Sequence, residues 1–372
     1  MPSLEVRSRP PFRADHVGSL LRPPELAEAR AAHRAGRLPD DALRDVEDRC
    51  VERAVARQEE TGLRAATDGE YRRAYWHYDF VSGLDGVEIY EPEQKIQFKG
   101  ATLPHALRVT GRIAYRRPVM VDHFRFLAGH VRGAVPKQTI PSPSVVHFRG
   151  GRGAIDRNAY PKMEPFFADL GEAYRAAIRA FADAGCRYLQ LDEVYIAYLC
   201  DPAQVEGLKA RGEHVENLLG IYADLINRAI ADRPADMTVS MHLCRGNFRS
   251  TWVAAGGYEP VAETLFNRID ADAYFMEYDT DRAGGFEPLR LLPKGKHVVL
   301  GVVTTKTGQL ESKDDLKRRI DAAAKFAPLD QLCLSPQCGF ASTEEGNTLA
   351  EDEQWAKLAM IVEVAREVWR DA

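Results

Sequence analysis

The chain has 372 residues, of which 45% are hydrophobic, so it can bury a large core. Its 50 basic and 55 acidic residues leave a formal net charge of −5, which gives no reason to expect a nucleic-acid or anionic membrane partner. The sequence contains no run of about 18 apolar residues and no signal-peptide core, and its six cysteines are scattered. We therefore expect a cytoplasmic protein with reduced thiols and no transmembrane helix.

Strand-like runs alternate with helical patterns after a lead-in, residues 1–11, that we expect to be flexible. The eight predicted strands are Phe12–Val17, Arg64–Thr67, Pro136–Ile140, Tyr188–Leu191, Met237–Met241, Ala273–Met276, His297–Val302 and Gln331–Leu334. Amphipathic spacing predicts helices over Asp40–Thr61, Met163–Ala184, Glu213–Ala231, Lys313–Phe326 and Asp352–Trp369. Gly185 stands where a helix C-cap glycine belongs.

This alternation predicts the fold class. Strands that alternate with helices indicate a parallel sheet, and eight such units indicate a closed barrel. Residues 83–120 interrupt the alternation of strands and helices. Their segments IQFKG and LRVTGRIAY predict a β-hairpin inserted after the second strand. We therefore expect an α/β fold, a single (β/α)₈ TIM barrel domain over residues 1–372 with this insertion.

Polar side chains follow the carboxyl ends of the predicted strands, where barrels of this class build their active sites. The first strand is followed by Gly18 and Ser19, the second by TDGE and the fourth by LQLDE. The later strands run into SMHLCRGN, FMEYD, VVTTKTG and LSPQCGF. All these candidates should therefore lie on one rim.

Two residues on this rim, His242 and Cys244, are suited to bind one metal ion. They are two positions apart, so on an extended strand both side chains point to the same face. A His-x-Cys pair alone is weak evidence, but Glu277 and Cys338 end two other strands and complete a four-ligand set that suits Zn²⁺. Zinc deprotonates a bound thiol, whereas a free thiol is only slightly ionised at neutral pH. The set favours alkyl transfer to sulfur over hydrolysis.

Six motifs in order, HVGSLLRP, DGE, LDE, MHLCRGN, MEYD and SPQCG, carry a family resemblance. Together they resemble the catalytic domain of cobalamin-independent methionine synthases, and the closer match is to the short, single-barrel branch of that family. The resemblance runs from about Phe12 to the C-terminal helix. It implies zinc ligands at His242, Cys244, Glu277 and Cys338.

The same resemblance implies a pocket for an amino acid. Ser19 would hold the substrate carboxylate, and Glu70 and Asp192 would hold its ammonium group. Two carboxylates facing one cation are favourable only while that cation is bound. The alternative is that Glu70 or Asp192 pairs with an arginine such as Arg72 or Arg245.

The sequence departs from the family after the seventh strand. Long family members carry a proton-donating histidine there, whereas this chain has VVTTKTG, with Lys306. We expect Lys306 to take that catalytic role, with a histidine elsewhere, such as His16, as the alternative. Rim aromatics could either stack on a flat methyl donor or simply pack; they are Trp76, His77, Tyr78, Trp252 and Phe340.

The expected function is zinc-dependent transfer of a methyl group to the thiol of homocysteine, as in methionine synthesis, from a donor similar to methyltetrahydrofolate. The expected partners are these two small molecules, and we expect no nucleic-acid or membrane partner. The sequence does not decide whether the chain forms a homo-oligomer. One alternative is a zinc alkyltransferase for another small thiol, although a sulfonate thiol would demand a cationic cluster. Another is a non-catalytic barrel with a structural zinc or a bound ligand, since four ligands also suit a closed site.

Overall fold

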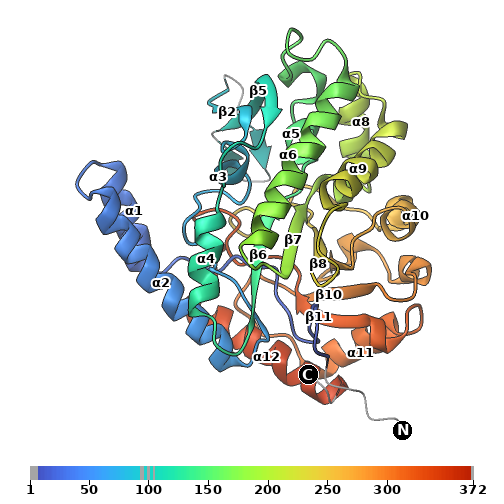
Figure 1. The fold of residues 1–372 in the computed structure, drawn as a ribbon. Coiled ribbons are helices and arrows are strands. Elements are labelled where there is room, and N and C mark those ends of the chain that lie inside the picture. Colours follow the sequence, from blue (N-terminus) through green and yellow to red (C-terminus); the bar gives the residue numbers. More distant parts are fainter. Residues whose placement is uncertain (1–6, 93–95, 99–100, 104, 370–372) are drawn as a thin grey trace.

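A curled parallel sheet forms the centre of the computed structural model, which describes residues 7–92, 96–98, 101–103 and 105–369 (Figure 1). Seven strands pair in the order β1-β6-β7-β8-β9-β10-β11, and every pairing is parallel. They are β1 (Ala65–Ala66), β6 (Val135–Pro141), β7 (Tyr188–Glu193), β8 (Thr238–Leu243), β9 (Ala273–Glu277), β10 (His297–Val303) and β11 (Leu332–Pro336). The predicted parallel α/β barrel is confirmed, with one difference at its first strand.

The predicted strand Phe12–Val17 is an irregular segment with a single parallel bridge, from Ala14 to Leu334 of β11. Asp15 N donates to Leu334 O (3.0 Å), and Leu334 N donates to the carbonyl of the residue before Ala14 (2.8 Å). The Asp15 carboxylate also accepts the backbone N–H of Phe12 and of His16, so local side-chain bonds replace part of a ladder. On its other side the segment reaches β1 through the His16 ring, which lies 3.3 Å from Ala65 O.

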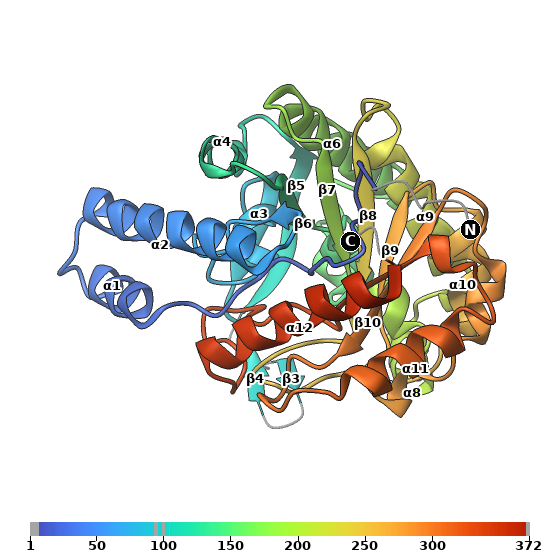
Figure 2. The same ribbon diagram turned by 90° about the horizontal axis from the view of Figure 1, so that it is seen from below.

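Helices surround the sheet, and α1 and α2 form a pair that extends away from it (Figure 2). The helices are α1 (Pro24–Arg34), α2 (Asp40–Thr61), α3 (Tyr78–Val81), α4 (Val121–His130), α5 (Val145–Phe148), α6 (Met163–Asp183), α7 (Tyr195–Tyr198), α8 (Pro202–Ala210), α9 (Val215–Ile230), α10 (Glu259–Asn267), α11 (Lys313–Ala323) and α12 (Glu351–Trp369). The five predicted helices occur with small boundary shifts, and Gly185 has the predicted left-handed φ of 95°. Among the described residues, no helix combines the length and apolar character needed to span a membrane.

The predicted insertion contains two hairpins, and its pairing differs from the expected one. β5 (Ala106–Ala114) pairs antiparallel with β2 (Asp85–Tyr90), while β3 (Ile96–Phe98) pairs with β4 (Ala101–Leu103). The sequence suggested that the segment of β3 would pair with that of β5. Strand β2 was missed because DGVEIY contains Gly86, which occupies a left-handed φ of 75° at an irregularity in the pairing.

A buried ion pair occupies the end of the barrel opposite the candidate site. Lys137 Nζ lies 3.2 Å from Asp15 Oδ1, both side chains are fully buried, and Tyr188 OH donates to Asp15 Oδ2 (2.8 Å). Lys137 also donates to His16 O and lies 4.0 Å from the centre of the Phe275 ring. These contacts join the irregular N-terminal segment to β6, β7 and β9. Residues 1–6 of the predicted lead-in lie outside the described part of the chain.

Candidate metal centre and substrate pocket

Four side chains from three strand ends converge at the carboxyl edge of the sheet. His242 lies near the end of β8 and Cys244 just after it, Glu277 is the last residue of β9, and Cys338 follows β11 by two residues. One potential ligand atom from each lies within 4.8 Å of all the others, and all four residues are buried. The structure thus brings together the four residues that the sequence analysis selected.

Two of the distances within the cluster match those of a tetrahedral zinc site. His242 Nε2 lies 3.4 Å from Cys338 Sγ, which lies 3.6 Å from Cys244 Sγ. Zn–S bonds of about 2.3 Å and Zn–N bonds of about 2.0–2.1 Å give tetrahedral ligand–ligand separations of roughly 3.5–3.8 Å. Two thiols, one imidazole and one carboxylate are also ligand types that zinc prefers. The cluster could therefore hold a zinc ion with little rearrangement.

The two thiols of the cluster titrate as a pair. A hydrogen bond from Cys244, together with the charge of His242, holds the pKa of Cys338 well below its ordinary value. The same hydrogen bond and burial raise the pKa of Cys244. A backbone N–H, that of Gly246, points at Cys244 Sγ (3.3 Å) and favours its charged form. The pair can therefore release its first proton readily, which favours metal binding.

Both oxygens of Glu277 accept hydrogen bonds from outside the cluster. Arg245 N donates to Oε1 (2.7 Å), and Arg282 Nη2 donates to Oε2 (2.9 Å) as well as to Asp279 Oδ1 (2.9 Å). Burial raises the pKa of Glu277, although the charges of Lys306 and Arg282 oppose this shift. These contacts fix the orientation of the carboxylate at the end of β9.

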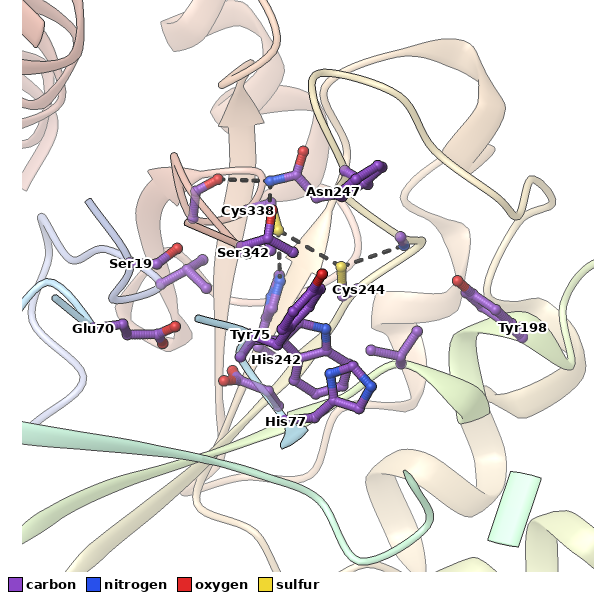
Figure 3. Close-up of a pocket in the computed structure, with 18 of the residues that line it drawn as sticks. Ser19, Glu70, Tyr75, His77, Tyr198, His242, Cys244, Asn247, Cys338 and Ser342 are labelled. Carbon is purple, nitrogen blue, oxygen red and sulfur yellow. Dashed lines mark hydrogen bonds between the residues drawn. The ribbon is translucent and has the colours of Figure 1, made fainter. Parts of the chain in front are cut away.

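A pocket opens beside the cluster (Figure 3). Three of the four metal candidates line it, and so do the predicted substrate residues Ser19, Glu70 and Asp192. Asp192 on β7 is the register partner of His242 on β8, which places the two side by side. The other lining residues are Val17, Tyr75, Trp76, His77, Arg149, Val194, Tyr198, Gly246, Asn247, Phe248, Gly339, Ser342 and Thr343.

Glu70 is held in a strained position that aims it into the pocket. Its φ is 60°, which is unusual for a residue other than glycine. Asp68 Oδ1 accepts Glu70 N (2.9 Å), and Thr139 donates to Glu70 Oε1 (2.8 Å). Glu70 Oε2 is buried and has no hydrogen-bond partner among the described residues. One acceptor is therefore available to a ligand.

The arginine beside Glu70 is Arg73, whose Nη1 lies 3.4 Å from Oε1, rather than either arginine named in the sequence analysis. Arg72 pairs with Glu47 (3.2 Å), and Arg245 stacks on Tyr258 at 4.2 Å from the ring centre. The alternative that one of the two acids pairs with an arginine is therefore confirmed for Glu70, but the partner is Arg73 and not Arg72 or Arg245. Arg73 was missed because its reach depends on the unusual turn at Glu70.

The second acid, Asp192, accepts a hydrogen bond from Gln190 Nε2 (2.7 Å). Burial and the neighbouring charge of Glu70 raise the pKa of Asp192 to about 7. Burial also raises the pKa of Glu70, against the charge of Arg73. Two close, buried carboxylates repel each other, so a cationic group placed between them would favour ionisation of both.

Ser19 lies where the backbone after β11 approaches the first segment of the chain. Its Oγ is 3.4 Å from Ala341 N, and its carbonyl accepts Phe340 N (2.9 Å). A Cβ at Gly339 would meet Ser19 Oγ at 1.9 Å, so a larger residue there would displace the Ser19 hydroxyl. This close contact keeps the hydroxyl at the pocket wall.

Lys306 lies behind the pocket wall, where its Nζ is 3.3 Å from Asn247 Oδ1. Asn247 in turn donates to Gly339 O (2.9 Å) and lines the pocket itself. The predicted alternative, His16, contacts Ala65 O at the end of the barrel opposite the site. It is not among the residues that line the pocket. Of these two candidates, only Lys306 lies beside the cluster.

The rim aromatics divide into two groups. Trp76 and His77 line the pocket, whereas Tyr78, Trp252 and Phe340 do not. Sequence reasoning missed several lining residues, including Arg149 and Tyr198. Asn247 could have been found, because it follows Cys244 by three residues in the same loop, but nothing in the sequence places Arg149 or Tyr198.

Known proteins resemble this chain over nearly its whole length. The family model described as cobalamin-independent synthase, catalytic domain, matches residues 12–367. A Bacillus subtilis protein named uncharacterized protein YxjH is 49% identical over 98% of this chain and 97% of its own length. The 5-methyltetrahydropteroyltriglutamate–homocysteine methyltransferase of Bacillus velezensis is 23% identical over 90% of this chain and 40% of its own length. A Listeria monocytogenes structure, solved as a candidate vitamin-B12-independent methionine synthase, is 38% identical with a TM-score of 0.79, covering 98% of this chain and 99% of that one.

Proposed function

Because the chain belongs to the cobalamin-independent methionine synthase family, we propose that it transfers a methyl group to the thiol of homocysteine. The observation that carries this proposal is the shared pocket. Glu70 and Asp192, two buried acids suited to an ammonium group, line the same pocket as His242, Cys244 and Cys338. A substrate with an amino group at one end and a thiol at the other matches this arrangement.

The metal centre is proposed to hold zinc. His242, Cys244, Glu277 and Cys338 would be its ligands, consistent with their mutual distances. When bound, zinc would supply a positive charge that lowers the pKa of a nearby substrate thiol, so that the nucleophilic thiolate is present at neutral pH. If the substrate sulfur replaced Glu277 as a metal ligand, the hydrogen bonds from Arg245 N and Arg282 would still hold the displaced carboxylate.

The amino-acid part of homocysteine would lie between Ser19 and the two acids. Glu70 Oε2 has no partner among the described residues and would accept a hydrogen bond from the ammonium group, as would Asp192. The Ser19 hydroxyl would donate to the carboxylate. Charge-assisted hydrogen bonds of this kind are stronger than neutral ones, so they would orient the substrate and leave its thiol directed at the cysteines.

The methyl donor would carry its methyl group on nitrogen, like the 5-methyltetrahydropteroyltriglutamate named for the Bacillus velezensis relative. A bond forms between the substrate sulfur and the methyl carbon while the bond from that carbon to nitrogen breaks. The leaving nitrogen takes the electron pair and requires a proton. Lys306, held by Asn247 beside the cluster, is the proposed source of that proton.

The two alternative functions fit the pocket less well. A sulfonate thiol would call for several cations, but Arg149 is the single Lys or Arg side chain among the described lining residues. A purely structural zinc would not require the strained Glu70 and the acidic wall beside it. Homocysteine therefore remains the preferred substrate.

Metal analysis of purified protein tests the metal centre. Wild type should contain about one zinc per chain, and Cys338→Ser should lose most of it without unfolding, because the core does not depend on the ion. Cys50→Ser is the matched control, since Cys50 is also buried but lies on α2 outside the cluster. Equal zinc in wild type and Cys338→Ser would contradict the assignment.

Calorimetric titration of the zinc-loaded protein tests the substrate. Homocysteine should bind and release more protons at neutral pH than homoserine, because its thiol becomes a thiolate in the pocket, whereas the ammonium group of either amino acid favours ionisation of Asp192. Titration in two buffers of different ionisation enthalpy counts the protons. Equal proton release by the two amino acids would instead favour a site that recognises only the amino-acid part, and no binding would favour the structural-zinc alternative.

A further inference from the structure

Three separate segments of the chain build the part of the pocket proposed for homocysteine. Ser19 belongs to the irregular N-terminal segment, Glu70 to the loop after β1, and Cys338 to the loop after β11. In Figure 3, Ser19 and Glu70 lie on the same side of the two cysteines of the cluster. A small amino-acid thiol can contact all three segments at once only if their separation is fixed. The groups that join the segments therefore matter for binding.

The side chain of Arg22 joins all three segments. Its Nη1 donates to Leu20 O (3.1 Å) and to Ala341 O (2.7 Å). Its Nη2 donates to Glu70 O (2.8 Å) and to Arg73 O (3.2 Å). A guanidinium has two hydrogens on each terminal nitrogen, so all four are donated to backbone carbonyls. One rigid, planar group thus fixes the backbone of the N-terminal segment and of both loops relative to one another.

Glu70 needs such support, because its φ of 60° is unfavourable for a residue with a Cβ. A strained backbone of this kind persists only where the surrounding contacts hold it. The bond from Arg22 Nη2 to Glu70 O is one of these contacts. Burial raises the pKa of Glu70, and the charges of Arg73 and then Arg22 oppose that rise. Arg22 therefore supports both the conformation of Glu70 and its negative charge.

Arg22 itself is not among the residues that line the pocket, whereas Ser19 and Glu70 are. It can therefore act on a ligand only through the residues that it holds. A binding site needs its side chains held within about 0.5 Å of the productive geometry by the residues around them. Because Arg22 bonds to the backbone of Glu70 itself and next to Ser19, its loss would displace both ends of the amino-acid site.

We propose that Arg22 is a positioning residue that makes the pocket selective for a thiol carrying an amino-acid group. This inference rests on the proposed function and adds to it the origin of the selectivity. The guanidinium keeps Ser19 and Glu70 at the separation at which they bind the carboxylate and the ammonium group while the thiol reaches the metal cluster. Without Arg22 the cluster still binds a thiol, but the pocket no longer recognises the amino-acid part.

Two thiols test this selectivity by direct binding to the zinc-loaded protein. The probes are homocysteine and 2-mercaptoethanol, which lacks both the ammonium and the carboxylate. Wild type should bind homocysteine at least about tenfold more tightly, as expected for charge-assisted hydrogen bonds. Arg22→Met should lose most of this preference while its zinc content and its affinity for 2-mercaptoethanol stay unchanged. Arg22→Lys should keep part of the preference, because an ammonium can donate to some of the same carbonyls.

A double-mutant cycle with Glu70→Gln separates positioning from general destabilisation. If Arg22 acts through Glu70, the double variant should lose much less homocysteine affinity than the product of the two single losses. Independent effects would multiply instead. Arg34→Met is the matched control, since Arg34 also reaches the loop after β11 but bonds the Glu344 side chain (2.7 Å) and is 58% exposed. This control should keep the wild-type preference.

The outcomes separate this role from the proposed function. An Arg22→Met variant with the wild-type preference for homocysteine overturns the role of Arg22. An equal loss of affinity for both thiols, or losses that multiply in the cycle, also overturns it. If Arg22→Met does not fold, Arg22→Lys takes its place in each comparison, and a full wild-type preference in that variant together with multiplied losses overturns the role. Absence of homocysteine binding in wild type refutes the proposed function, on which this role rests.

Discussion

Glu70 and Asp192 are two buried acids that line the same pocket. Arg73 faces one oxygen of Glu70, and Gln190 donates to one oxygen of Asp192. The raised pKa of Asp192, about 7, is caused by burial and then by Glu70. An ammonium ligand would relieve both effects, because it supplies the opposite charge at short range. The same pair would bind a neutral ligand poorly.

Substitution of either acid should weaken homocysteine binding without loss of zinc. Glu70→Gln and Asp192→Asn keep the side-chain shape but remove a charged acceptor, which typically costs ~1.5–3 kcal/mol, or about tenfold to a hundredfold in affinity. Calorimetry measures the affinity and metal analysis the zinc content. Glu47→Gln is the control, since Glu47 is buried but pairs with Arg30 (3.0 Å) away from the pocket. Unchanged affinity in both pocket variants would remove these acids from the proposed site.

Gly301 on β10 allows β9, β10 and β11 to approach closely at the end of the sheet that carries the cluster. It is the register partner of Glu277 on β9, and β10 pairs with β11 just before Cys338. A Cβ at Gly301 would stand 2.7 Å from Gln337 Cα and 2.8 Å from Met276 O, both of which are backbone atoms. Neither neighbour can move without shifting a strand that carries a metal candidate.

Gly301→Ala should therefore destabilise the fold by about 1–3 kcal/mol, the usual range for overpacking. Urea unfolding measures this change, and the zinc content of the variant should fall as well because the strand ends move apart. Gly129→Ala is a suitable control: Gly129 lies in α4, and an added Cβ would have no atom within 4 Å. That change should be neutral or stabilise the helix by about 0.5–1 kcal/mol. Equal stability of the two variants would contradict the role of Gly301.

The sequence could predict the elements whose pattern is local and periodic. Six of the seven observed strands of the barrel sheet were placed within about two residues, and β1, though shorter than predicted, lies inside its range. The segment Phe12–Val17 looked like a strand, but the Asp15 carboxylate competes for its backbone N–H groups. Among the candidate site residues, position on the rim was enough to group the four side chains that the structure brings together, His242, Cys244, Glu277 and Cys338. Arg73 and Arg149 could not be predicted as site residues, because their positions beside Glu70 and the pocket depend on tertiary structure.

The buried His16, at the end of the barrel opposite the site, should make the stability of the whole protein depend on pH. Burial, followed by the charge of Lys137, lowers the pKa of His16 from 6.5 to about 4. Between these values the unfolded chain binds more protons than the folded one, so stability rises with pH across this range. The contribution is fully present above about pH 6.5 and is lost as the pH falls toward 4, by up to roughly 3 kcal/mol.

His16→Gln tests this origin, because glutamine does not titrate. The free energy of unfolding, measured in urea at several pH values between 4 and 7, should fall less steeply with acid in this variant than in wild type. His214→Gln is the control, since the His214 side chain is 84% exposed and its substitution should leave the slope unchanged. A wild-type slope in His16→Gln would assign the acid sensitivity to other groups.

The order of the metal candidates along the chain also matters while the protein is being synthesised. Cys244 and Cys338 are 94 residues apart, and the segment after Phe12 contacts β11 only once Leu334 exists. At about 5–20 residues per second, the ribosome needs roughly 5–20 s to add this stretch. Throughout that interval the nascent chain contains His242 and Cys244 but still lacks Cys338. The four candidate ligands can therefore be brought together only after Cys338 has been translated.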